Sequence, residues 1–189
     1  MKTALLSAYT KNEELADFAK ALREREWDIL ASAGTKKFLT EQGVESIDVA
    51  TIAGEPILGH RVVTLSREIH AGLLARNEDE PELKRLHIRR IDLVLCDLYP
   101  LEEEIARPGA TEETVIEKTD IGGPAMLRSG AKGRRIVISS REQIPEVLAY
   151  LDSNLEDKKF LTRLAGEAEK LVALYVTASA AYTLRASNS

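Results

Sequence analysis

The stretch Ile91-Asp92-Leu93-Val94-Leu95-Cys96-Asp97-Leu98 decides the fold, because it is almost continuously apolar over the length of a strand and is soon followed by Pro100. A strand with one face in water alternates apolar and polar residues, whereas a continuous apolar run indicates that both faces are covered. Such strands are typical of parallel sheets that lie between two layers of helices. The stretch therefore predicts a central strand in an α/β protein.

Four further short apolar runs are predicted to be strands of the same sheet, at 4–8, 27–31, 47–50 and 135–138. Helical patterns follow the first and the last of these runs. After the first run, an apolar stripe at i, i+3, i+4 and i+7 consists of Leu15, Phe18, Ala19 and Leu22. After the last run, a capping box of Ser140 and Gln143 precedes an apolar stripe of Ile144, Val147, Leu148 and Leu151. This alternation predicts a three-layer α/β/α sandwich with a mainly parallel five-stranded sheet, whose ligands bind at the carboxyl ends of the strands.

Two segments between these runs have their own signals. The helix that follows the second strand is expected to begin with Thr35 as its N-cap and to stop at Gly43. Residues 51–67 lack a clear period and contain two glycines and a proline. We expect this segment to be a long, functional loop.

The C-terminal segment, 157–184, has the pattern of one or two helices, and its last part is apolar on nearly all sides. An apolar helix of this kind must pack on something, and a second subunit is an economical partner. We therefore expect residues 1–153 to form the α/β domain and residues 154–189 a helical extension. The extension would pack on that domain or on the other subunit of a homodimer.

The composition excludes several classes of protein. Its 189 residues, 44% hydrophobic and 30% charged, are typical of one globular domain with a full core. The net charge of −5 disfavours a nucleic-acid-binding or membrane-binding surface. No signal peptide is recognised, and the longest uncharged apolar run, 171–184, is too short to span a bilayer. We therefore expect a cytoplasmic protein.

Neither the cysteine nor the histidines indicate a metal site. The single cysteine, Cys96, lies within the most apolar run and is expected to be a buried, inert thiol. The three histidines, His60, His70 and His87, are scattered rather than spaced as ligands.

Two predicted strand-to-helix junctions carry groups that suit a phosphate. Ser7-Ala8-Tyr9-Thr10-Lys11 and Ser32-Ala33-Gly34-Thr35 each place hydroxyls and free backbone N–H groups at a helix N-terminus, where the helix dipole favours an anion. Arg61-Val62-Val63-Thr64, in the long loop, offers a guanidinium and a hydroxyl to the same anion. Serine and threonine are also ordinary N-caps, so these junctions alone do not establish a site.

A second group of candidates surrounds the predicted start of another helix. Asp120 precedes Gly122-Gly123-Pro124, which opens this helix and permits close backbone approach to a ligand. Lys132 lies at its C-terminal end, where it also complements the helix dipole. Tyr99 follows the most apolar strand and therefore stands at the expected ligand edge.

Several motifs occur in the same order as in one known family and cover essentially the whole chain. They are Ser7 to Lys11, Ala31 to Thr35, Arg61 to Leu65, His70 to Arg76, Leu98-Tyr99-Pro100, Pro108-Gly109, Asp120 to Pro124 and Ala131-Lys132. In these motifs the chain resembles the inosine monophosphate (IMP) cyclohydrolase domain of the bifunctional purine enzyme that also carries an aminoimidazole carboxamide ribonucleotide (AICAR) transformylase. No segment of this sequence matches the transformylase half.

The resemblance implies a methylglyoxal-synthase-like fold, a homodimer, and chemistry without a metal or a cofactor. The reaction it implies is the ring closure of the formamido-imidazole carboxamide ribonucleotide (FAICAR) to IMP, with loss of water, so the partner would be a purine ribonucleotide monophosphate. A separate AICAR transformylase is a further expected partner. By motif, the substrate and its 5′-phosphate would be held by Ser7, Lys11, Ser32, Gly34, Thr35, Arg61, Thr64, Asp97 and Gly122, and the reacting groups would meet Tyr99, Asp120 and Lys132.

The chain also departs from the pattern of that family. Val63 stands where the family has a catalytic lysine, and Ser66-Arg67 replaces a His-Pro pair. Tyr9, His60 and Asp97 stand where the family has serine, glycine and asparagine. Loss of one cationic oxyanion stabiliser costs on the order of 100-fold or more in rate. Arg67 is the nearby residue that we consider as a replacement, although a guanidinium is a poor proton donor.

Two other functions compete with cyclohydrolase. The first is a catalytically impaired homologue that binds a purine nucleotide and lost the chemistry at Val63. The second is methylglyoxal synthase or another enzyme of the wider fold, which eliminates a small phosphate. The sequence disfavours the second, because it lacks that enzyme's phosphate loop and its His-Asp-Pro stretch, whereas Ile121-Gly122-Gly123-Pro124 matches the cyclohydrolases.

Overall fold

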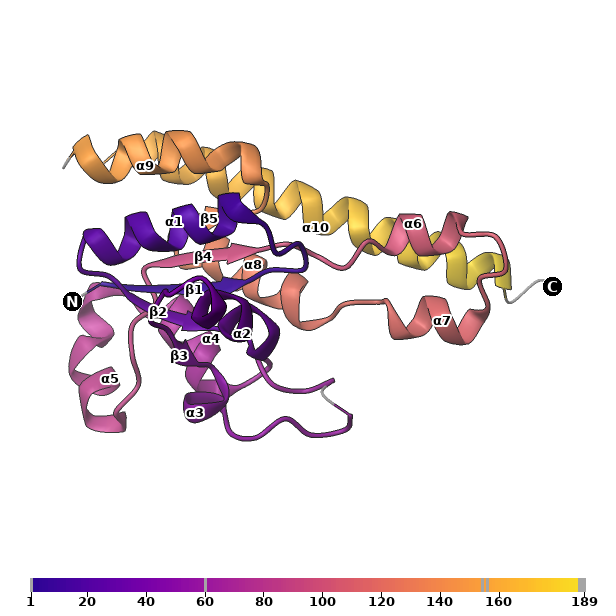
Figure 1. Ribbon diagram of the computed structural model, residues 1–189, viewed down its shortest axis with the longest axis horizontal. Helices are drawn as coiled ribbons and strands as arrows, with labels where there is room; N and C mark the ends of the chain where they lie inside the picture. Colours follow the sequence, from indigo (N-terminus) through magenta and orange to yellow (C-terminus); the bar gives the residue numbers. More distant parts are fainter. Residues whose placement is uncertain (1, 60, 154, 156, 187–189) are drawn as a thin grey trace.

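The computed structural model describes residues 2–59, 61–153, 155 and 157–186. Within these residues five strands form one parallel sheet in the order β3-β2-β1-β4-β5, as Figure 1 shows. The strands are β1 (Thr3–Ser7), β2 (Asp28–Ala31), β3 (Ile47–Asp48), β4 (Leu93–Cys96) and β5 (Ile136–Ile138). The predicted sheet is confirmed, and every residue of β4 is buried, as its apolar run indicated.

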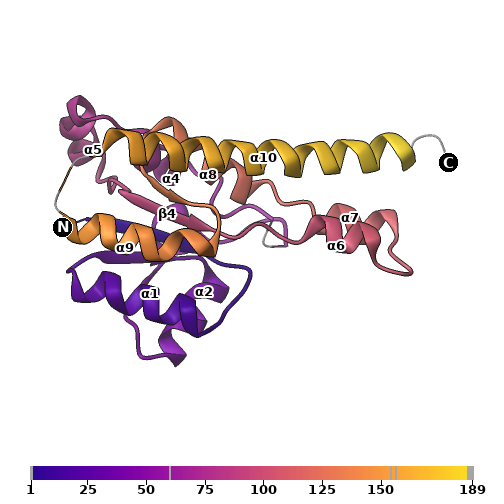
Figure 2. The same ribbon diagram turned by 90° about the horizontal axis from the view of Figure 1, so that it is seen from above.

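Alternate residues along the strands face two separate apolar cores. Leu6 and Leu95 face one core, and Leu5 and Val94 face the other. The first core is covered by α1 (Glu13–Glu24), α2 (Ala33–Glu41) and α9 (Ile144–Ser153), and the second by α3 (Ala50–Ala53), α4 (Arg67–Leu74) and α8 (Gly122–Lys132). Figure 2 shows α1 and α2 on one side of β4 and α4 and α8 on the other. The predicted three-layer sandwich is therefore confirmed.

The C-terminal pattern forms one long helix, α10 (Lys158–Ala186). Its first half packs along α8 and β5 and buries Leu164, Ala168 and Val172 in the cores of the α/β part. Its second half runs past the edge of the sheet beside α6 (Leu101–Ala106) and α7 (Glu112–Glu117), as both ribbon views show. We call α6, α7 and the second half of α10 the arm. The expected domain boundary falls at residue 154, which lies outside the described residues.

Two local expectations need correction. The N-cap of α2 is Ser32 rather than Thr35, because Ser32 has an extended backbone while Thr35 lies inside the first turn. The expected loop over 51–67 begins with α3 and ends with the first residue of α4. By contrast, Gly43 ends α2 as predicted, in the left-handed conformation with φ of 73°.

A 3₁₀ turn, Arg141–Gln143, lies between β5 and α9, and the other remaining helices lie between β3 and α8. Besides α4, α6 and α7 they include the 3₁₀ turn Asn77–Asp79 and α5 (Glu80–Leu86), which packs on a small separate cluster of Ala75, Leu83 and Ile88. No helix of the described chain has both the length and the apolar composition needed to cross a bilayer.

Candidate functional site

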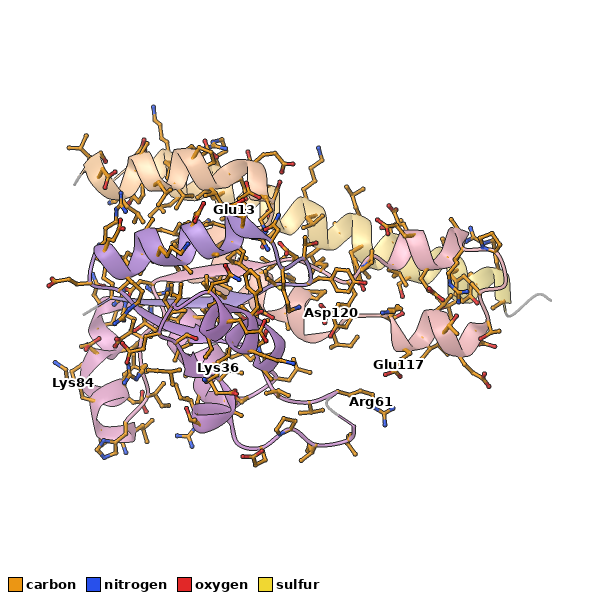
Figure 3. The ribbon with its side chains drawn as sticks, viewed as in Figure 1. Glu13, Lys36, Arg61, Lys84, Glu117 and Asp120 are labelled. Carbon is orange, nitrogen blue, oxygen red and sulfur yellow. The ribbon has the colours of Figure 1, made fainter. Side chains whose placement is uncertain are left out.

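Most of the predicted site residues lie at the carboxyl edge of the sheet. β1 and β4 end there at Ser7 and Cys96, and α2 and α8 begin there at Ala33 and Gly122. This edge faces the arm in Figure 1, and Figure 3 shows Asp120 between the sheet and α7. Two helix N-termini at one sheet edge favour negatively charged ligands.

The loop after β1 and the first turn of α2 form an anion cradle, made of Lys11, Ser32, Gly34 and Thr35. Lys11 lies over this turn, since a Cβ atom on Gly34 would stand 3.3 Å from Lys11 Cε. Its ammonium donates to the carbonyl oxygen of Ala8 at 3.0 Å. The buried Thr35 hydroxyl accepts the N–H of Ala8 at 3.0 Å and the Ser32 hydroxyl at 3.1 Å. The cradle therefore combines a lysine with free N–H groups, which suits a phosphate.

Asp120 is held at the start of α8 by backbone groups. Its Oδ1 accepts the N–H of Gly123 at 3.0 Å. Burial raises the pKa of the Asp120 carboxyl above its ordinary value, while the N–H groups of Gly122 and Gly123 counteract this. A carboxyl group with a raised pKa, placed at a ligand edge, is suited to take up and release a proton.

Tyr99 follows β4 at the same sheet edge as Asp120, and its side chain is partly in solvent. It is 43% exposed and contacts Tyr9 edge to face, with ring centroids 5.5 Å apart. Burial, and after it the Asp120 carboxylate, raises the pKa of the Tyr99 phenol. At neutral pH the phenol is therefore protonated and can donate a hydrogen bond.

Two further predicted site residues join this edge, and the cysteine that was expected to be inert lies there too. Ser7 pairs with Cys96 at the ends of β1 and β4. Thr64 approaches α8, because a Cβ atom on Gly122 would stand 2.7 Å from Thr64 Oγ1. Cys96 is 1% exposed, and burial raises the pKa of its thiol well above the ordinary value, in agreement with an inert cysteine.

Asp97 was expected to bind the ligand, but its side chain is paired with an arginine. Its carboxylate is paired with the Arg141 guanidinium at 2.6 and 2.9 Å, and both side chains are mostly buried. Arg141 also donates to the carbonyl oxygen of Thr10 at 2.9 Å. Asp97 thus fixes the loop that carries Lys11.

Two predicted residues stay apart from the site. Arg61 lies on the exposed loop, with its Nε donating to the Leu58 carbonyl oxygen at 2.7 Å, and Figure 3 shows it separated from Asp120. Lys132 is the last of the 11 residues of α8 and is exposed. A helix of that length spans about 16 Å, so Lys132 lies near the amino edge of the sheet while Asp120 lies at the carboxyl edge.

Of three residues at which the chain departs from the family pattern, two contact other parts of the fold and one lies outside the described residues. Arg67 does not replace the lost lysine, because it lines a hollow between α4 and α5. Val63 packs against the second apolar core. His60 lies outside the described residues.

Sequence reasoning missed three residues that shape the site, namely Lys118, Arg141 and Tyr175. Lys118 Nζ lies over the rings of both Tyr9 and Tyr99. The Tyr175 hydroxyl, from α10, accepts the N–H of Asp120 at 2.8 Å and donates to the Lys118 carbonyl oxygen at 3.0 Å. Only Lys118 carried a signal in the sequence, because it lies two residues before a singled-out aspartate.

The described residues contain no group of three or more histidine, cysteine or acidic side chains that would hold a metal ion. The edge carries a phenol, a carboxyl group, a lysine and two helix N-termini. Such a set can move a proton and stabilise a developing negative charge.

Comparisons with known proteins agree with this arrangement. The profile of the MGS-like domain family matches residues 14–125. The bifunctional purine biosynthesis protein PurH of Streptococcus agalactiae is 39% identical over 188 residues, a match that covers 96% of this chain and 36% of PurH. PurH of Ligilactobacillus salivarius is 48% identical over 163 residues, which cover 82% of this chain and 31% of that protein. The chain thus spans about a third of the length of these curated relatives.

A solved structure shares the whole architecture. The crystal structure of ForH superposes on this chain with a TM-score of 0.83 and 32% sequence identity, covering 95% of each chain. The resemblance drawn from the motifs and the predicted fold class are both confirmed by these matches.

Proposed function

The chain belongs to the MGS-like domain family, and from this premise we propose that it is an IMP cyclohydrolase, which closes the second ring of FAICAR with loss of water. The observation that carries the proposal is the placement of Tyr99 and of Asp120, at the start of α8, on the same sheet edge as the anion cradle. The similarity to the matched third of PurH supports it.

In the proposed reaction the substrate phosphate binds in the anion cradle, where Lys11 and the α2 N-terminus balance its charge. The carboxamide nitrogen attacks the formyl carbon. Asp120 accepts the proton that this nitrogen loses, and the Tyr99 phenol donates a hydrogen bond to the formyl oxygen. Lys132 has no part in this scheme, because it lies at the opposite edge of the sheet.

The proposed substrate implies a supplying reaction. FAICAR carries a formyl group on the amino nitrogen of AICAR, so a formyl transfer must precede ring closure. We propose that a separate AICAR transformylase provides it.

The experiment that tests the proposal is an ultraviolet progress curve for conversion of FAICAR to IMP. A control without enzyme is required, because the ring closes slowly unaided. Closure well above this control supports the proposal, and a rate equal to the control refutes it.

A second candidate is a nucleotide-binding protein without catalysis, and the position of Val63 favours it. Val63 packs into the apolar core, so no cation stands where the family has its lysine. This candidate predicts that IMP raises the melting temperature while FAICAR closes no faster than in buffer. A Val63→Lys variant that gains activity would support it, whereas catalysis by the wild type excludes it.

A further inference from the structure

We propose that Lys118 supplies the positive charge at the reacting end of the site, an inference that rests on the proposed ring closure. Lys118 follows α7 as its C-cap residue, and its Nζ lies 5.7 Å from the ring centroid of Tyr9 and 5.8 Å from that of Tyr99. It precedes Asp120 by two residues. The segment 118–120 therefore carries both the cation and the carboxyl group, and the cation lies over the Tyr99 ring, which comes from a separate segment of the chain.

The charge of Lys118 is available to a ligand. It lines a hollow of about 370 Å³ together with Tyr9, Pro100, Glu103, Glu104, Ala106 and Arg107. Glu104 is held by Arg107 through two hydrogen bonds of 2.7 and 2.9 Å. Among the described residues no carboxylate forms an ion pair with Lys118 within 4.0 Å. The ammonium therefore faces the two aromatic rings and the open hollow, and it acts electrostatically on the Glu104 carboxylate without pairing with it.

The segment that carries Lys118 is fixed by α10. The Tyr175 hydroxyl bridges the carbonyl oxygen of Lys118 and the N–H of Asp120. This bridge sets the spacing between the lysine and the carboxyl group, and it leaves the lysine side chain to adjust to a ligand.

The other positively charged side chains considered for the site lie away from Tyr99 or have other partners. Lys11 belongs to the anion cradle, and Arg67 faces the hollow between α4 and α5. Arg141 is paired with Asp97. Lys118, by contrast, lies over the Tyr99 ring, 5.8 Å from its centroid.

A cation at this place assists ring closure. As the bond between the carboxamide nitrogen and the formyl carbon forms, negative charge develops on the formyl oxygen, and a nearby ammonium stabilises it. One hydrogen then leaves each of the two nitrogens. The formyl C–O bond breaks, and the oxygen departs with these two hydrogens as water.

The test compares Lys118→Met and Lys118→Arg in the FAICAR assay. Lys118→Met is expected to lower kcat on the order of 100-fold with little change in KM, while Lys118→Arg keeps part of the activity because it keeps the charge. Lys84→Met is the matched control, because Lys84 is exposed on α5 and Figure 3 shows it far from Asp120.

The outcomes separate this inference from the proposed function. If the wild type catalyses closure and Lys118→Met matches Lys84→Met, the inference is overturned and the function stands. A merely structural role would lower the melting temperature of Lys118→Met without the expected fall in kcat, and it would also overturn the inference.

If the wild type does not catalyse closure, calorimetric titration with IMP decides. Tenfold weaker binding by Lys118→Met supports Lys118 as the ligand's cation, whereas equal or undetectable binding in both proteins overturns it.

Discussion

At the scale of single residues, the two aspartates of the site are stabilised in opposite ways. Asp97 is neutralised by Arg141, so its charge is used to fix a loop. Asp120 is held by backbone N–H groups at a helix N-terminus, and burial raises its pKa. A buried carboxylate costs stability unless it is paired or hydrogen-bonded. Burial of the Asp120 carboxyl group therefore costs stability, and it provides a group that can take up and release a proton.

Replacing Asp120 with asparagine is expected to change the pH dependence of stability. Because the folded pKa is raised, the folded protein binds the proton more tightly than the unfolded chain, and this stabilisation is lost as pH rises from the ordinary value of 3.8 through the folded pKa. Relative to the wild type, Asp120→Asn should therefore gain stability from acidic to neutral pH, as measured by urea unfolding at a series of pH values. A constant difference between the two proteins would contradict this.

At the scale of elements, α8 is placed by a close contact with the sheet. Gly130 sits above β4 and β5, and a Cβ atom there would stand 2.7 Å from Val94 Cγ1 and 3.0 Å from Val137 Cγ2. This approach brings the start of α8, with Asp120 just before it, down to the ends of the strands.

The substitution Gly130→Ala is expected to destabilise the protein by about 1–3 kcal/mol through overpacking, although alanine favours a helix. Gly166→Ala is the matched control, because nothing lies within 4 Å of a Cβ atom at Gly166 of α10. It should instead stabilise by about 0.5–1 kcal/mol. Urea unfolding measures both, and changes of the same sign in the two variants would refute this account of α8.

Helix α10 acts on the site through Tyr175. Tyr175→Phe removes both hydrogen bonds to the segment 118–120, which are 2.8 and 3.0 Å long. We expect a loss of about 1–3 kcal/mol in stability and a lower kcat, because Lys118 and Asp120 lose their fixed spacing. The FAICAR assay and urea unfolding check this.

Tyr182→Phe, on the same helix, controls for the loss of a hydroxyl. It should leave kcat unchanged, because Tyr182 lies about two helical turns beyond Tyr175 on α10. Equal kcat values for Tyr175→Phe and the wild type would show that α10 does not position the site.

At the scale of the whole molecule, the arm extends beyond the sheet in both ribbon views. Leu174 and Val176, on the second half of α10, are 58% and 54% exposed. Exposed apolar side chains on a projecting helix favour association with a second copy. We therefore propose that the chain forms a homodimer through the arm.

Light scattering after size-exclusion chromatography should give about twice the mass of one chain. The double variant Leu174→Glu with Val176→Glu should give the mass of one chain, because two buried charges would oppose the interface. Leu155→Glu should remain dimeric, although Leu155 is 70% exposed, because it lies far from the arm. A wild-type protein with the mass of one chain would refute the proposal.

The sheet and the edge at which the site lies follow from local sequence patterns. A strand buried on both faces must be apolar throughout, so the run at 91–98 was readable without the structure, and the residues that follow each strand necessarily share one edge. Helix ends with local signals, such as Gly43, were equally readable.

Only the tertiary structure decided which charged groups meet. α8 runs against the direction of the strands, so Lys132 ends at the amino edge although the motif order suggested otherwise. The partners of Asp97 and Asp120, Arg141 and Tyr175, come from 44 and 55 residues away. Local periodicity specifies elements, because it depends on neighbouring residues. The meeting of distant side chains depends on how whole helices pack, and no short pattern carries that information.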